Sequence, residues 1–182
     1  MKKYMFTAAA VLASAAGLAN AQSYNGPGFT ISDVAVNSST LAVDAAGPLS
    51  TVEVSFFGIQ HTWFADLTCY LTAPNGDVLN LFHRPNTSGD PSGTYNFSDS
   101  ASAAVTASDL AGGTFLAQGG TFSAAFGGDE AGGIWRLNID DLAGGDVGSI
   151  SGWQLRINTV PTPGAAALVG FAGLAAFRRR RA

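Results

Sequence analysis

The sequence predicts an all-β protein that folds as a β-sandwich, and three observations support this prediction. Between residues 22 and 160, short stretches alternate apolar with polar residues, which is the period of a half-buried strand. Gly, Pro, Asn, Asp and Ser separate these stretches, and turns between strands favour these residue types. The same segment shows no stretch with the periodicity of an amphipathic helix. Its length suits a single domain with a substantial core.

The first predicted strands lie before residue 83. Residues 50–58 (STVEVSFFG) place every second residue on one apolar face. Residues 65–82 (ADLTCYLTAPNGDVLNLF) read as two strands joined by a turn from Pro74 to Asp77, which predicts a β-hairpin. Residues 120–126 (GTFSAAF) form a weaker strand candidate, within a region where long surface loops are expected.

Two tryptophans begin matching rows in the last two predicted strands. Trp135 lies in GIWRLNID and Trp153 in GWQLRI, and each is followed at spacings of two by Leu and Ile. Period-two alternation puts each row on the inward face of its strand. We therefore predict that Trp135 and Trp153 are buried in the core and mark its two inward-facing rows of side chains. We expect the two rings to close the same end of the core, with both indole N–H groups bonded near the loop from 140 to 152.

Cys69 is the only cysteine, so no disulfide can form within the chain. It shares a predicted strand face with Leu67 and Leu71. A buried, inert thiol is favoured over a reactive one.

Residues 1–21 have the layout of a secretory signal peptide. Two lysines precede an apolar stretch, and Ala19-Asn20-Ala21 supplies the small residues of a cleavage site. Cleavage after Ala21 would leave Gln22 as the first residue. The alternative, a membrane anchor, is disfavoured because the apolar stretch is shorter than the roughly 20 residues of a spanning helix.

Residues 161–182 combine a proline motif, an apolar stretch and an arginine block. Pro161, Thr162 and Pro163 precede the stretch from Gly164 to Phe177. The block consists of Arg178, Arg179, Arg180 and Arg181. As a helix the apolar stretch would rise about 21 Å, against a hydrocarbon core of about 30 Å. This order of parts resembles the PEP-CTERM class of bacterial sorting tails, with Thr162 in place of the usual Glu. The resemblance implies export across the inner membrane to the bacterial cell envelope or surface, sorting machinery as a partner, and membrane contact before processing. Cleavage of the tail and retention as a short anchor both remain open.

The charge of the middle segment differs from that of the whole chain. Residues 22–160 contain three arginines, Arg84, Arg136 and Arg156, and no lysine, against all 13 acidic residues, for a formal charge of −10. Nucleic acid and anionic membrane surfaces would repel such a domain. Such a charge suits metal cations or cationic partners. The alternative explanation is that the acidity serves only solubility outside the cell.

Motifs from about Phe29 to Asn158 resemble the P domain (P/Homo B domain) of the proprotein convertases. They are His-Thr, Asp-Leu before a strand, Pro-x-Gly at a turn, Phe-Gly, Gly-x-Trp-x-Leu-x-Ile-Asp, Gly-Asp-x-Gly and Trp-x-Leu. The matching positions are His61, Thr62, Asp66, Leu67, Pro74, Gly76, Phe126, Gly127, Gly133, Trp135, Leu137, Ile139, Asp140, Gly145, Asp146, Gly148, Trp153 and Leu155. Ala65 and Ala73 replace the usual Gly and Ser. The resemblance implies an eight-stranded jelly-roll sandwich similar to galactose-binding domains.

The resemblance also implies a role beside a subtilisin-like catalytic domain, which P domains stabilise and modulate. The residues themselves predict no enzyme. Only His61 and His83 could act as the base of a Ser-His-Asp triad, and no Gly-x-Ser-x-Gly or His-Glu-x-x-His motif is present. We predict no catalytic residue, although the family name associates the domain with serine endopeptidases.

Calcium is the one cofactor that the residues suggest. Asp66, Asp99 and Asp140 are the candidate ligands, with Asp141 and Asp146 also at predicted strand ends or loops. No fixed-spacing calcium motif accompanies them. Capping of turns is the competing interpretation for each aspartate.

These observations predict an exported, surface-sorted, non-catalytic module for binding, adhesion or structural support. A surface glycan or protein would meet Tyr95, Trp63 or Phe64 where these are exposed, although burial is the favoured interpretation for each. The last two are adjacent, so one of them is expected to point outward and the other inward. Two alternatives remain: an accessory domain acting with a separately encoded serine protease, and a passive component of a matrix or surface layer.

Overall fold

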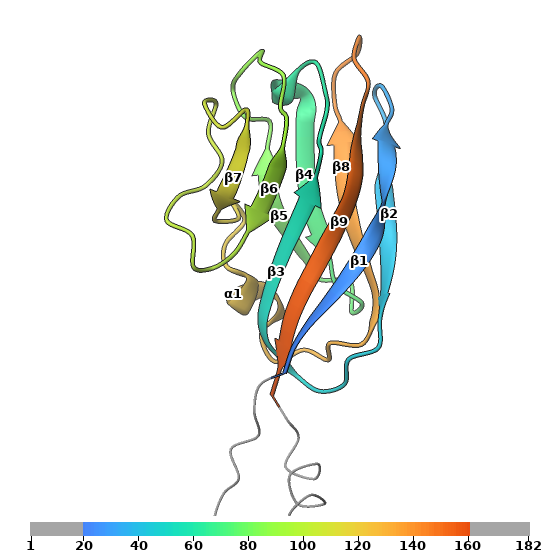
Figure 1. Cartoon of the computed structure of the whole chain (residues 1–182), viewed down its shortest axis with the longest axis vertical. Coiled ribbons are helices and arrows are strands. Elements are labelled where there is room, and N and C mark those ends of the chain that lie inside the picture. The colour runs from blue at the N-terminus through green and yellow to red at the C-terminus, as the bar shows by residue number, and fades with distance from the viewer. Residues whose placement is uncertain (1–19, 161–182) are drawn as a thin grey trace, which may run out of the picture. The chain divides into compact units, whose positions relative to one another are not determined.

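Two β-sheets packed face to face form the part of the chain that the computed structural model describes, residues 20–160 (Figure 1). The first sheet contains, in spatial order, β1 (Asn20–Ile31), β9 (Gly148–Thr159), β3 (Leu49–Phe57), β6 (Thr94–Phe97) and β7 (Gly112–Phe115). The second contains β2 (Ser38–Val43), β8 (Gly133–Asp141), β4 (Leu67–Thr72) and β5 (Val78–His83). The all-β sandwich is therefore confirmed. It has nine strands in this part of the chain, one more than the eight that the resemblance implies.

The chain passes repeatedly between the sheets, because β1 and β3 lie in the first sheet while β2 and β4 lie in the second. Neighbouring strands are antiparallel except for β6 and β7, which are parallel. The predicted hairpin is confirmed as β4 and β5. Its turn is held by the Ala73 N–H, which donates to the Asp77 carbonyl, and Gly76 takes a φ of 95° that suits glycine.

The sandwich has two different ends. Asn20 at the beginning of β1 pairs with Thr159 at the end of β9, so both ends of the described chain leave at the same place (Figure 1, bottom). The opposite end consists of four loops, which we call the loop rim: residues 32–37, 58–66, 84–93 and 142–147 (Figure 1, top). The rim therefore lies at the opposite end of the sandwich from Asn20 and Thr159.

The predicted cleavage residues Ala21 and Gln22 lie at the start of β1, opposite Asn158 and Ile157. Residues 1–19 and 161–182 lie outside the described part of the chain. The rest of the predicted signal peptide, the proline motif, the apolar helix and the arginine block of the sorting tail fall in these segments.

Alternation along the strands determines which side chains enter the core. On β8, Trp135, Leu137 and Ile139 are fully buried, whereas Arg136 is exposed. Cys69 on β4 is also fully buried, and burial raises the pKa of its thiol well above the usual range. This position agrees with the predicted inert thiol.

The strand candidate at 120–126 is wrong, because this segment holds the short helix α1 (Phe122–Phe126). The Thr121 hydroxyl accepts the Ala124 N–H and caps the helix. Phe122 and Phe126, four residues apart, then bury their rings on one side. The prediction of a strand failed because the spacing of four between Phe122 and Phe126, which is a helical spacing, also fits an alternation of period two. Nowhere in residues 20–160 is there a helix with the length and apolar character needed to cross a membrane.

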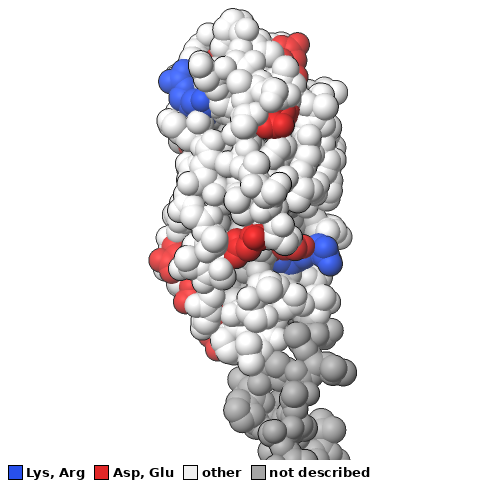
Figure 2. Space-filling view, turned by 90° about the vertical axis from the view of Figure 1, so that its left-hand side faces the viewer, with Lys and Arg blue, Asp and Glu red and all other residues white. Residues whose placement is uncertain are grey.

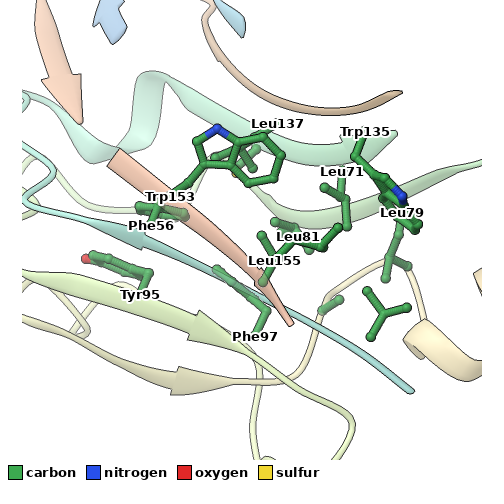
Figure 3. Close-up of a cluster of buried hydrophobic side chains, with 14 of the residues drawn as sticks. Phe56, Leu71, Leu79, Leu81, Tyr95, Phe97, Trp135, Leu137, Trp153 and Leu155 are labelled. Atoms are coloured by element: carbon green, nitrogen blue, oxygen red, sulfur yellow. The ribbon is translucent and has the colours of Figure 1, made fainter. Parts of the chain in front are cut away.

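The two core tryptophans do not close the same end of the sandwich, which corrects that expectation. The indole N–H of Trp153 donates to the Ser39 hydroxyl on β2 at 3.0 Å, and that of Trp135 donates to the Ala131 carbonyl before β8 at 3.0 Å. Figure 3 shows the Trp153 and Trp135 rings on opposite sides of Leu71 and Leu81. Neither partner belongs to the loop from 140 to 152. Alternation determines the face of a side chain and says nothing of its height along the strand.

Trp153 fits its site because the facing residue of β1 is Gly26. A Cβ atom on Gly26 would lie 2.1 Å from Trp153 Nε1, and the fully buried ring has no space into which to move. At Gly144, in the loop rim, the nearest atom to an added Cβ is 3.5 Å away, an ordinary contact.

We expect Gly26→Ala to lower the free energy of unfolding by about 1–3 kcal/mol, since overpacking forces a buried side chain off its position. Gly144→Ala is the matched control and should change it by about 0.5 kcal/mol or less. Urea unfolding of the full chain, followed by tryptophan fluorescence, measures both. Equal stability of the two variants would contradict the tight packing of Trp153 on Gly26.

Candidate functional site

The loop rim is built on the ends of buried strands. Residues 58–66 follow β3 and end in a single 3-10 turn, η1 (Phe64–Asp66). Gln60 and Ser149 exchange two backbone hydrogen bonds of 2.9 Å, which tie this loop to the start of β9. The Asp33 carboxylate accepts the Gly145 N–H at 3.0 Å and joins two further rim loops. The rim is thus a connected surface.

His61 and Asp141 form a buried pair beneath the rim. His61 Nε2 lies 3.3 Å from Asp141 Oδ2, and neither side chain is accessible to solvent. His61 Nδ1 lies 3.1 Å from the Trp63 backbone nitrogen, and Asp141 Oδ1 accepts the Ala143 N–H. Nδ1 also lies 3.1 Å from the Trp63 carbonyl oxygen, so it has a backbone partner whether or not it carries a proton. The pair therefore holds two rim loops together.

Asp66 lies beside this pair and contacts Arg84, whose guanidinium is 3.5 Å from its carboxylate. Burial raises the pKa of Asp66, and the negative charge of Asp141 adds to that shift, while Arg84 acts in the opposite direction. Thr62 donates its hydroxyl hydrogen bond to Asp146 at the edge of the same region. Sequence reasoning placed these residues individually but did not predict that they meet.

The three candidate calcium ligands are not brought together. Asp99 accepts the N–H groups of Phe122 and Ser123 and caps α1 at the other end of the sandwich. Asp140 accepts the Asn37 N–H and the Tyr70 hydroxyl. Across residues 20–160, no three His, Cys, Asp or Glu side chains are arranged to hold a metal ion. Asp99 and Asp140 thus act as hydrogen-bond acceptors for nearby backbone and side chains.

The candidate contact aromatics separate as the alternation implies, with one exception. Trp63 is 44% exposed and Phe64 is fully buried. Tyr95 is wrong as a surface contact, because its side chain is fully buried against Phe56 and Phe64. Burial raises the pKa of Tyr95, and its hydroxyl donates to the Asp109 carbonyl. Tyr95 and Phe97 alternate with partly exposed neighbours along β6 and share its inward face, so the ring enters the core.

Exposed apolar side chains also gather on the rim. Besides Trp63 they are Val34, Val36, Leu142 and Val147, each at least 46% exposed. Val34 has a φ of 48°, a left-handed conformation that β-branched residues rarely adopt. Sequence reasoning missed these residues. The available signal was valine and leucine within aspartate- and glycine-rich loops, where polar residues are the rule.

An open cleft of about 520 Å³ lies on the rim, between residues 60–62, 90–92 and 147–149. Its polar lining residues include Gln60, His61, Asp90 and Ser92, with Val147 as an apolar neighbour. Figure 2 shows acidic atoms spread over one face of the molecule, while basic atoms occupy small separate areas. The cleft therefore lies on a negatively charged protein.

Comparison with known proteins identifies related sequences and folds. The sequence pattern described as the proprotein convertase P-domain matches residues 49–157, more than half of the chain. Two crystal structures from Aeromonas sobria are similar: its serine protease, at 18% identity and a TM-score of 0.46, and the complex of that protease with its chaperone, at 17% and 0.48. The matches cover 76% and 78% of this chain and 27% and 28% of those chains, so this chain spans about a quarter of their length. Comparison with curated proteins gives no match.

We expect Asp141→Asn to lower the free energy of unfolding by about 1–3 kcal/mol. Both carboxylate oxygens accept hydrogen bonds, so the amide nitrogen of Asn would either leave the Ala143 N–H unsatisfied or face His61 Nε2 and force the imidazole proton onto Nδ1. Asp90→Asn is the matched control, since the Asp90 carboxylate is exposed and should change stability by about 0.5 kcal/mol or less. Thermal unfolding of the full-length variants measures the difference. An Asp141→Asn protein as stable as the control would contradict the role of the buried pair.

Proposed function

The chain belongs to the proprotein convertase P-domain family, and we propose that it is an exported module that binds another protein at the cell surface. Domains of this family are non-catalytic accessory domains of subtilisin-like proteases. The loop rim is the proposed binding surface. The observation that carries this proposal is the combination, on one end of the sandwich, of exposed apolar side chains with a connected and internally bonded set of loops.

The geometry of His61 supports a non-catalytic role. A triad histidine uses one ring nitrogen for the acid and presents the other to a nucleophilic hydroxyl. In this chain Nε2 faces Asp141, and Nδ1 faces the Trp63 backbone at 3.1 Å. No ring nitrogen is left for a nucleophile, and the imidazole is inaccessible to solvent. His83, the other histidine, bonds to Thr68 on the exposed side of β5.

Export and surface sorting are proposed from the sequence patterns of residues 1–21 and 161–182. The position of β1 and β9 agrees with such a role, because both chain ends leave the sandwich opposite the rim. A tail that attaches the protein at residue 161 would therefore leave the rim loops accessible to a partner. Sorting to the bacterial envelope is part of this proposal.

A serine protease is the partner that family membership favours. P domains act beside catalytic domains, so we propose that this chain supplies the same support to the catalytic domain of a protease. Adhesion to a surface glycan would rest on Trp63 alone, because Tyr95 and Phe64, the other two expected contacts, are buried.

We expect no covalent labelling when the full chain is incubated with a fluorophosphonate probe, which reacts with the activated serine of serine hydrolases. A gel with in-gel fluorescence measures labelling, with subtilisin as the positive control. A labelled band that disappears in His61→Gln would show that His61 activates a serine and would overturn the non-catalytic assignment.

We expect a photo-crosslinking residue placed at Val147, on the rim, to capture a serine protease from the secreted or surface fraction of the source cells. The matched control places the same residue at Val78, which is 55% exposed at the opposite end. Mass spectrometry identifies the captured protein. Capture of the protease from Val78 and not Val147, or of no protease from either position, would contradict the rim as its binding surface.

A further inference from the structure

Asp90 differs from every other acidic residue of the protein. All 13 acidic residues lie within residues 20–160, and the side chains of the others accept a hydrogen bond or join an ion pair. Within the same described residues the Asp90 carboxylate does neither, and the residue is exposed. Asp90 is also one of the residues that line the rim cleft of about 520 Å³. Asp90 therefore offers a carboxylate with no partner among residues 20–160, beside a space large enough for a side chain or small ligand.

The groups around Asp90 are rich in hydrogen-bond acceptors. The Thr62 hydroxyl already donates to Asp146, and the Ser92 hydroxyl already donates to the Leu110 carbonyl, so both oxygens retain acceptor capacity. The Gln60 amide oxygen adds a third acceptor to the lining. Such a cleft suits a ligand that donates several hydrogen bonds and carries positive charge.

The surrounding charge favours a partner of opposite sign. Residues 20–160 carry three arginines against 13 acids. Two of the three, Arg84 and Arg156, pair with Asp66 and Glu53. A second copy of the same acidic domain would be repelled, whereas a basic protein surface would be attracted.

We infer that this cleft binds an arginine side chain of the protein partner, with Asp90 as its counter-charge. The planar guanidinium offers five donors, which matches a carboxylate flanked by several acceptors better than the single ammonium of lysine. Val147, which is 64% exposed, provides apolar surface for the methylene stem. The inference rests on the proposed function, because it specifies the chemistry of the partner that the rim binds.

The test uses the ¹⁵N-labelled full chain, kept soluble in a non-denaturing detergent, and two capped peptides of sequence Gly-Val-Arg-Gly and Gly-Val-Gln-Gly. Addition of the arginine peptide should shift the amide resonances of Thr62, Ser92 and Val147, and the glutamine peptide should not. We expect Asp90→Asn to raise the Kd of the arginine peptide about five-fold. Binding should weaken as salt concentration rises.

Asp44→Asn is the matched control, because it removes the same charge from the opposite end of the sandwich. Its side-chain oxygen can still accept the Tyr24 hydroxyl hydrogen bond. The control should bind the arginine peptide like the unchanged protein. Equal shifts with both peptides, no shifts at all, or the same Kd for Asp90→Asn and Asp44→Asn would overturn the arginine site. The photo-crosslinking result at Val147 does not depend on Asp90, so failure of the cleft and failure of the proposed function are distinguishable.

Discussion

The packing of Trp153 between the two sheets is the interaction on which the rest of the structure depends. Its strand, β9, pairs with both β1 and β3 in the first sheet. Its indole N–H donates to Ser39 on β2 in the second sheet, and the Ser39 hydroxyl donates in turn to the Pro27 carbonyl on β1. One buried ring thus connects both layers by hydrogen bonds as well as by apolar contact. A buried indole without this partner would leave an unsatisfied donor in the core.

The pairing of β9 with β1 also separates the two ends of the sandwich, and the proposed binding surface lies at only one of them. β1 and β9 are paired from Asn20 and Thr159 to Ile31 and Gly148, so both ends of the described chain lie together, and the loop rim lies at the other end of the sandwich. There the His61–Asp141 pair is enclosed and serves as a link between loops. The same residue types that suggest catalysis in a sequence therefore perform a structural task, and the exposed parts of the rim are left for binding.

The sequence predicted much of the fold but little of the site, for physical reasons. Alternation identified the buried faces of β8 and β9, and the Pro74 to Asp77 turn identified the hairpin, because both signals are local. The different heights of Trp135 and Trp153 depend on register between sheets, which alternation does not encode. The carboxylate of Asp90 looks like any surface aspartate in the sequence. Only the folded chain shows that the other acidic groups have partners and that this one lines a cleft.

Hydrogen exchange of the tryptophan indole N–H groups, followed by NMR on the full chain, tests the closure of the sandwich around Trp153 most directly. The indole of Trp63, which is 44% exposed, is the internal reference and should exchange rapidly. The account predicts that the Trp153 indole exchanges only as fast as the whole domain unfolds. Exchange of Trp153 at a rate close to that of Trp63 would contradict it, because the two sheets would then not be joined through a buried, hydrogen-bonded ring.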